Sequence, residues 1–282
     1  MPERVDDPIL QRALSLGDEG DWEGMAEVLR AELEEREDDP ALLCWLGVAE
    51  RELGMDGVAY ERFRRCLAAQ PQDPRILATA GNAVAAFDDP EAESALRAAS
   101  VLGSELPMTR WLYGAYLARE GLLDDAFREL DAAAGLAPED PAIRLERGVA
   151  FALAGDLVQA GAELERSVEL TVGDGWGLVL LGLIRVEELD LEEGAASLEQ
   201  GARERPEDVE AQVLASLALA ALEREDDAYE MLERGRIRAQ GADRALIGEA
   251  ESQLEEGPEQ ARRFLLKTLA PSVLRERLMT RP

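Results

Sequence analysis

The sequence has no histidine, one lysine (Lys267) and two cysteines (Cys44 and Cys66) among its 282 residues. Histidine is the side chain that most often serves as a general base, and no serine, cysteine or pair of carboxylates stands in a recognisable catalytic arrangement. The cysteines are not spaced like metal ligands, and without histidine a zinc site has too few soft ligands. These absences predict that the chain is not an enzyme, that it holds no metal or cofactor, and that both thiols are reduced and structural.

Long hydrophobic runs are also missing from the sequence. The longest, Gly177 to Ile184, ends at Arg185 and is far too short to span a bilayer. The N-terminal stretch MPERVDDPIL has neither the basic nor the apolar region of a secretion signal. We therefore expect a soluble, cytoplasmic protein with no membrane insertion.

Cations are scarce relative to acids. Sixty Asp and Glu oppose thirty Lys and Arg, which gives a formal net charge of -30. Such a surface repels the phosphates of nucleic acids and anionic lipid headgroups, so neither is an expected partner. Aromatic residues make up only 5% of the chain, whereas leucine and alanine are abundant within the 46% that is hydrophobic. This composition favours closely packed helices over sheets.

A small residue recurs along most of the chain at steps of 33 or 34 positions, as a close crossing of two helices requires. The members of this column are Gly47, Gly81, Gly114, Gly148, Gly182, Ser216 and Ala250. A second column of mostly alanine follows twelve positions later, and four positions after it stands leucine or phenylalanine, as in Ala59 with Phe63. Residues four apart share one helical face, so each period predicts a helical hairpin.

Turn and end signals follow the same period. Glycines such as Gly54 separate the two helices of a hairpin, and prolines such as Pro71 close the second helix. The stretch from Pro40 to Pro71 resembles a tetratricopeptide repeat, because it carries Leu43, Leu46, Gly47, Gly54, Ala59, Phe63 and Pro71 at the spacing of that family. The resemblance covers nearly the whole chain. It implies an all-α, right-handed α-solenoid of about eight helix-turn-helix units in a single domain, 1–282.

The repeat phase also predicts where the units begin and where the array ends. Units are expected to begin near Asp6, Pro40, Pro74, Pro107, Pro141, Gly175, Val209 and Asp243, with no linker between them. After Pro271, apolar residues at helical spacing follow Ser272, which is placed to cap a helix. These residues predict a C-terminal capping helix at 272–280.

In the tetratricopeptide family, the first helices form a concave face that binds extended peptides or partner helices, and the fifth and ninth positions of each unit point into it. Transferred by position, the resemblance implies a groove lined by Cys44, Val48, Ala78, Asn82, Trp111, Ala115, Leu145, Val149, Val179, Leu183, Val213 and Leu217, with Trp176 beside it as a further anchor. Almost all are apolar, and a continuous exposed apolar strip marks an interaction site. The alternative is that coiling of the array, or the C-terminal helix itself, buries the strip.

Three functions fit these features. The first is a scaffold or adaptor that binds an apolar or amphipathic segment of another protein in the groove. The second is a chaperone-like holder of a secreted or assembling client, kept in solution by its acidic exterior. The third is a structural module that self-associates through its C-terminal region, because residues 231–282 hold ten Lys or Arg against eight acids while the rest is strongly acidic.

Overall fold

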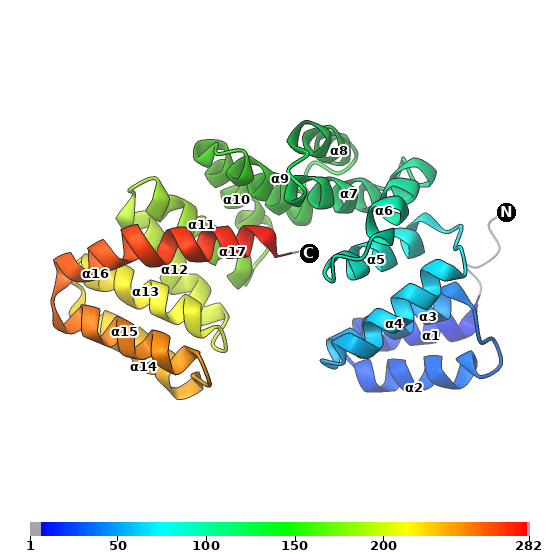
Figure 1. Cartoon of the computed structure of the whole chain (residues 1–282), viewed down its shortest axis with the longest axis horizontal. Helices are drawn as coiled ribbons and strands as arrows, with labels where there is room; N and C mark the ends of the chain where they lie inside the picture. Colours follow the sequence, from blue (N-terminus) through cyan, green and yellow to red (C-terminus); the bar gives the residue numbers. More distant parts are fainter. Residues whose placement is uncertain (1–6, 281–282) are drawn as a thin grey trace. The chain divides into compact units, whose positions relative to one another are not determined.

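A computed structural model describes residues 7–280, and within these residues every regular element is helical. The first helices of the units are α1 (Pro8–Asp18), α3 (Pro40–Glu52), α5 (Pro74–Ala85), α7 (Pro107–Arg119), α9 (Pro141–Leu153), α11 (Gly175–Glu187), α13 (Val209–Ala221) and α15 (Asp243–Glu255). The second helices are α2 (Trp22–Leu33), α4 (Asp56–Ala68), α6 (Glu91–Leu102), α8 (Leu123–Leu136), α10 (Leu157–Leu170), α12 (Leu191–Glu204), α14 (Glu225–Arg238) and α16 (Pro258–Phe264). The predicted all-α array of helical hairpins is confirmed (Figure 1). The expected first start, Asp6, lies outside the described residues.

Aspartate starts most of the first helices. The side chain of Asp39, for example, accepts a hydrogen bond of 2.9 Å from the backbone N–H of Ala41, and Pro40 occupies the first helical position. Carboxylates satisfy the unpaired N–H groups at a helix start and interact favourably with the helix dipole, and proline there loses no helical hydrogen bond. Part of the acidic excess of the chain therefore has a local structural role.

The column of small residues marks where the two helices of a hairpin touch. A Cβ atom added at Gly182 would lie 2.7 Å from Leu198 Cγ and 2.9 Å from the Leu198 backbone nitrogen. At Gly148 the added atom would lie 2.7 Å from Leu164 Cγ. These distances leave no room for a side chain, so the predicted pairing of a glycine with a leucine from the second helix describes real packing.

The chain divides into two compact units, and the boundary falls within α7. The first, here the N-terminal unit, extends to Tyr116, and the second, the C-terminal unit, comprises Leu117–Thr280. Phe63 and Leu96 are at the centre of the N-terminal unit, and the core of the C-terminal unit is built from leucine, valine and alanine of α9 to α17. The prediction of a single domain stays a prediction.

The last unit departs from the expected pattern. After α15, a turn at Gly257 leads into α16, a π-helical stretch (Leu265–Leu269) and α17 (Ala270–Met279), which follow one another without a break. The sequence predicts a separate helix capped by Ser272, but α17 begins at Ala270 and Ser272 lies inside it. A proline ring clashes with the carbonyl four residues earlier in a regular α-helix, and the wider π-helical turn directly before Pro271 relieves that conflict.

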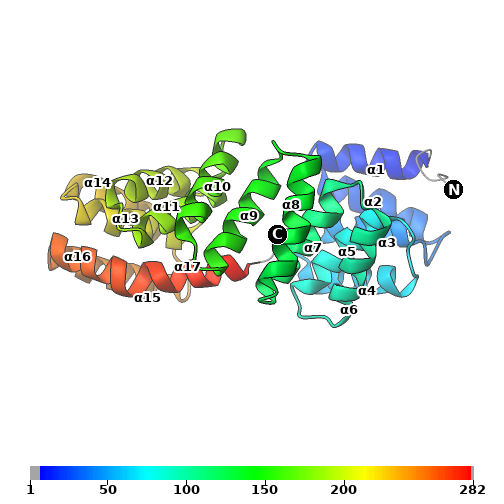
Figure 2. The same cartoon turned by 90° about the horizontal axis from the view of Figure 1, so that it is seen from above.

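Residues 258–279, here called the C-terminal segment, run back across first helices of earlier units (Figures 1 and 2). α16 and the π-helical turn pack against α13, while α17 packs against α11 and α9. We call the side of α9, α11 and α13 on which this segment lies the inner face of the C-terminal unit. In the C-terminal unit, the chain therefore covers its own first helices.

Candidate functional site

The predicted groove residues of the C-terminal unit are buried rather than exposed. Val179, Leu183, Val213 and Leu217 have no exposed surface, and Val149 is 1% exposed. Leu145 and Trp176 are half-buried and pack against the same core. The expectation that these side chains form an exposed strip is wrong for the five buried ones, because the helices that pack against α9, α11 and α13, including the C-terminal segment, enclose them. Their role in binding another protein stays a prediction.

α17 packs on the inner face in the way that an amphipathic helix packs into a groove. Its apolar residues Val273, Leu274 and Leu278 are buried, whereas Arg275 and Glu276 on its other side are exposed. The buried set falls at positions i, i+1 and i+5, which share one side of a helix. One charged residue, Arg277, lies among these apolar residues and is only 6% exposed.

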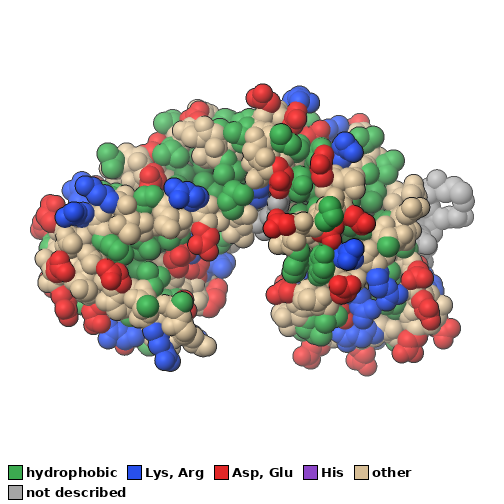
Figure 3. All heavy atoms as spheres, in the orientation of Figure 1, with side chains coloured by type: hydrophobic (Ala, Val, Ile, Leu, Met, Phe, Trp, Pro, Cys, Tyr) green, Lys and Arg blue, Asp and Glu red, His purple; other side chains and the backbone are tan. Residues whose placement is uncertain are grey.

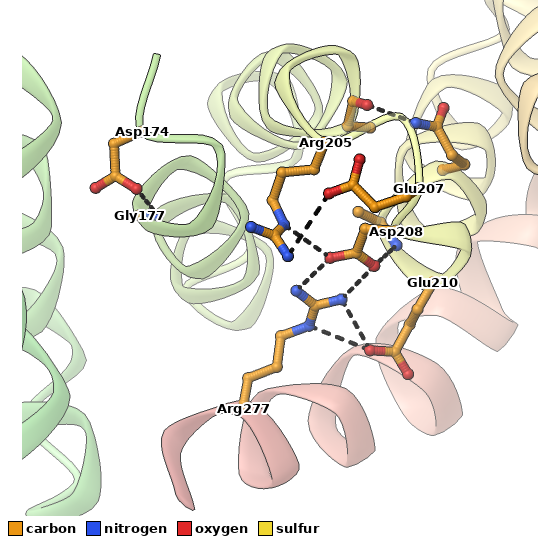
Figure 4. A network of polar contacts seen from close by, with 10 residues as sticks. Asp174, Gly177, Arg205, Glu207, Asp208, Glu210 and Arg277 are labelled. Carbon is orange, nitrogen blue, oxygen red and sulfur yellow. Dashed lines mark hydrogen bonds and ion pairs between the residues drawn. The ribbon is translucent and has the colours of Figure 1, made fainter. Parts of the chain in front are cut away.

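Arg277 joins α17 to the start of α13 (Figure 4). Its Nη1 and Nη2 atoms donate to the two carboxylate oxygens of Asp208 at 2.9 and 2.8 Å. Its Nε and Nη2 atoms donate to Glu210 Oε2 at 3.1 and 3.0 Å. Asp208 also caps α13 by accepting from the backbone N–H of Ala211 at 3.0 Å, and it accepts from Arg205 Nε at 3.2 Å. A guanidinium that donates to both oxygens of one carboxylate combines charge-assisted hydrogen bonds with a specific geometry.

The two carboxylates respond differently to this environment. Burial would raise the pKa of Asp208, but the hydrogen bonds and charge of Arg277 together with those of Ala211 and Arg205 lower it below its ordinary value. Burial raises the pKa of Glu210 and dominates there, although Arg277 opposes it. Asp208 is therefore the principal charged partner of Arg277.

Trp176 lies beside the same cluster. The guanidinium carbons of Arg277 and Arg205 are 5.1 and 5.6 Å from the centre of its indole ring. A cation over an aromatic face adds an attraction of about 0.5–2 kcal/mol, the larger values applying where water is excluded. The predicted anchor Trp176 is thus already in contact with a side chain of the C-terminal segment.

Thr280, directly after the C-terminal segment, makes a second polar contact. Arg119, at the end of α7, donates from Nε to the carbonyl oxygen of Thr280 at 2.9 Å. Its Nη1 atom donates to Glu146 Oε2 on α9 at 2.6 Å, and both side chains are 2% exposed. The sequence did not indicate Arg119 or Glu146, and Arg277 stood out only as one of the ten Lys or Arg of residues 231–282. The sequence did contain a signal for Arg277. It lies three positions after Leu274 and directly before Leu278, so it falls on the apolar side of the helix.

In the N-terminal unit, Val48 and Trp111 are half-buried, Asn82 is 9% exposed, and Cys44, Ala78 and Ala115 are fully buried. Cys44 donates from Sγ to the carbonyl oxygen of Ile76 at 3.9 Å, between α3 and α5. A hydrogen bond with Cys66 and burial raise the pKa of the Cys44 thiol well above its ordinary value. Cys44 is therefore a protonated core residue rather than a groove residue.

A pocket of 440 Å³ opens in the N-terminal unit between α3, α4 and α5. Its lining includes Asn82 together with Arg51, Glu52, Asp56, Ala59, Tyr60, Phe63, Ala83, Ala86 and Phe87. The rings of Tyr60 and Phe87 lie 4.6 Å apart, and Tyr60 is held by a hydrogen bond of 2.8 Å from its hydroxyl to Asp89. Phe87 is 47% exposed at the pocket. Of the predicted groove residues, Asn82 is the one that lines this pocket.

Within residues 7–280, no group of three or more acidic, cysteine or histidine side chains could hold a metal ion. None of the helices in this range has the length and apolar character needed to cross a membrane.

Comparison with known proteins identifies the fold. No protein-family model and no curated protein matches the sequence. Among solved structures, the chain is similar to one in the APC/C heterotetramer Cut9–Hcn1, with a TM-score of 0.69 and 16% identity over 88% of this chain and 49% of that one. It is also similar to PilW, a type IV pilus biogenesis factor (TM-score 0.58, 18% identity, 72% of this chain and 94% of that one). A third similar structure is that of PilF of Pseudomonas aeruginosa, with a TM-score of 0.58 and 17% identity over 77% of this chain and 99% of that one. The chain spans about half of the Cut9–Hcn1 chain that it matches. The protein therefore has the fold of the tetratricopeptide repeat proteins.

Proposed function

We propose that the chain is a cytoplasmic, non-enzymatic scaffold that binds an apolar or amphipathic segment of another protein on the first helices of its repeats. The observation that carries this proposal is α17, an amphipathic helix packed on the inner face of α9 and α11. Helix-in-groove recognition uses the same elements, an apolar stripe inserted between helices and a few polar contacts that fix its position. The array thus already binds one helix of the kind that we propose as its ligand.

The N-terminal unit offers the place for a partner from outside. Its pocket beside Asn82 has apolar walls from Phe63, Ala83 and Phe87, with charged side chains of α3 and α4 around them. Val48 and Trp111, on first helices of the same unit, are also half-buried and apolar, although they do not line the pocket. A large apolar side chain of the partner would fill the pocket, and Asn82 can form hydrogen bonds to its backbone.

Site-specific photo-crosslinking tests the proposal. A photoreactive phenylalanine analogue replaces Phe87 at the pocket, and the control carries it at Val101 on α6, which is 71% exposed and does not line the pocket. In extract of the source cells, the analogue at position 87 should crosslink to apolar or amphipathic segments of a small set of proteins. The control position should not give these crosslinks.

A blocking variant makes the same test specific for the pocket. Ala86→Arg places a long side chain at an exposed position of the pocket lining, so the fold should tolerate it. Ala68→Arg is the matched control, at an exposed residue near the end of α4 that does not line the pocket. The crosslinks should disappear with Ala86→Arg and persist with Ala68→Arg. Crosslinks that are the same in both variants would show that the pocket is not the binding site.

Self-association is a second candidate, supported by the outer side of the C-terminal segment. Arg262, Arg263, Lys267 and Arg275 are exposed, and none of them has an acidic partner within residues 7–280. Figure 3 shows basic side chains gathered over this segment. In a chain of net charge -30, these basic side chains could pair with the acidic surface of a second copy. Light scattering should then detect oligomers that dissociate as salt is added, and a monomer at every salt concentration would exclude this candidate.

A further inference from the structure

The C-terminal segment is attached to the rest of its unit in the manner of a bound ligand. It begins directly after Gly257, a half-buried turn residue with a φ of 108°, where an added Cβ would meet no heavy atom within 4 Å. From there α16 pairs with α15 as the second helix of the last hairpin but also packs on α13, and the segment then crosses α11 and α9. One glycine turn therefore separates α15 from the segment that covers the inner face.

The inner face carries groups that select an arginine. Asp208 and Glu210 together accept four hydrogen bonds from Arg277, and Trp176 lies 5.1 Å from its guanidinium carbon. Lysine would offer a single point charge and could not reproduce the paired contacts to Asp208. A helix with no cation at this place would leave two adjacent carboxylates without their main partner, which is costly in a partly buried site.

The same face also requires apolar side chains. If the C-terminal segment left, the apolar side chains of α11 and α13 that it covers would become exposed to water. Another amphipathic helix could cover the face without this cost. Its apolar residues would have to match Val273, Leu274 and Leu278, with arginine directly before the last of them.

We propose that the inner face of the C-terminal unit is a binding site for an amphipathic helix that carries an arginine within its apolar stripe, and that α17 is the internal occupant which such a helix displaces. The pattern to be matched is that of Val273, Leu274, Arg277 and Leu278. This inference rests on the proposed function, which it extends by naming a second site and the chemistry of the helix that enters it. The chain thereby blocks this site until a competing helix arrives.

The test uses a fluorescent peptide with the sequence of residues 265–280 and the full chain. The wild-type chain should bind this peptide weakly, because its own helix occupies the site. The Arg277→Ala chain should bind it about tenfold more tightly or better, since the internal occupant has lost its polar anchor. The Arg275→Ala chain, altered at an exposed neighbour outside any ion pair in residues 7–280, should behave as wild type. A peptide carrying Arg277→Lys should bind the Arg277→Ala chain less well than the original peptide.

Equal affinity of the peptide for the Arg277→Ala, Arg275→Ala and wild-type chains would overturn the inference. A measurement on the wild-type chain covers the case in which Arg277→Ala fails to fold. Excess unlabelled peptide should accelerate amide hydrogen exchange in residues 258–280 and leave exchange in α12 unchanged, and no acceleration would also overturn it. The outcome is separable from that of the crosslinking experiment, which probes Phe87 in the N-terminal unit. Failure of the peptide experiments with intact crosslinks would reject only this inference. Loss of the crosslinks with successful peptide binding would reject the pocket at Phe87 as a binding site and leave this inference standing.

Discussion

Gly182→Ala tests the packing of the hairpins most directly. The added Cβ would lie 2.7 Å from Leu198 Cγ, 2.9 Å from the Leu198 nitrogen and 3.0 Å from the Gly194 carbonyl oxygen. Two of these atoms belong to the backbone, so a change of rotamer cannot relieve the contact and α11 must move away from α12. Alanine gains about 1 kcal/mol over glycine in helix propensity, while overpacking a core costs about 1–3 kcal/mol. We expect a net loss of about 1–2 kcal/mol of unfolding free energy.

The control for this prediction is Gly248→Ala. Gly248 is exposed within α15, and a Cβ there would meet no heavy atom within 4 Å, so only the propensity gain of about 0.5–1 kcal/mol applies. Urea denaturation followed by far-UV circular dichroism measures both variants. The midpoint should fall for Gly182→Ala and rise or stay constant for Gly248→Ala. A Gly182→Ala midpoint at or above that of the wild type would refute the steric reasoning.

Three further predictions follow from buried groups. Arg119→Ala leaves Glu146 as a buried unpaired carboxylate and should cost about 3–5 kcal/mol in urea denaturation, whereas the uncharged double variant with Glu146→Gln should recover part of that loss. Because the pKa of Asp208 is lowered in the folded state, its contribution is present above its ordinary pKa of about 4 and disappears as the pH falls through the lowered value. Acid titration of the melting temperature should therefore show a smaller decline over that window for Asp208→Asn than for the wild type. The thiols of Cys44 and Cys66 are fully buried and the pKa of Cys44 is raised, so a thiol reagent at neutral pH should modify them only at the rate of unfolding, and rapid modification of the native protein would contradict this.

The repeats were predictable from sequence because each one repeats the same local physics. Gly182 and Leu198 must touch across a hairpin, and the sequence places a small residue and a leucine at those positions in almost every unit. Aspartate before proline at Asp39 marks a helix start in sequence as it does in the structure. Such signals involve residues close in sequence, and for this reason the helix bounds agree with the expected unit starts.

The burial of the predicted groove residues on the first helices was not predictable in this way. Val213 and Leu217 occupy positions that point into an open groove in a regular array, and their burial depends on a segment some fifty residues further along the chain. Pro271 indicates a helix end by local rules, yet the π-helical turn before it lets the helix continue. The path of residues 258–279 thus follows from tertiary contacts that no single repeat contains.

The contact between Arg119 and Thr280 joins residues 161 positions apart in the chain. In an ordinary repeat array each unit contacts only its neighbours, so unfolding can begin at an end and spread, and folding needs only local contacts. Here the end of the chain returns to α7 and α9, and Arg277 connects to Asp208 across 69 positions. These closures raise the contact order of the C-terminal unit. We expect it to fold more slowly than an open array of the same length and to unfold as one cooperative block rather than from its C-terminal end.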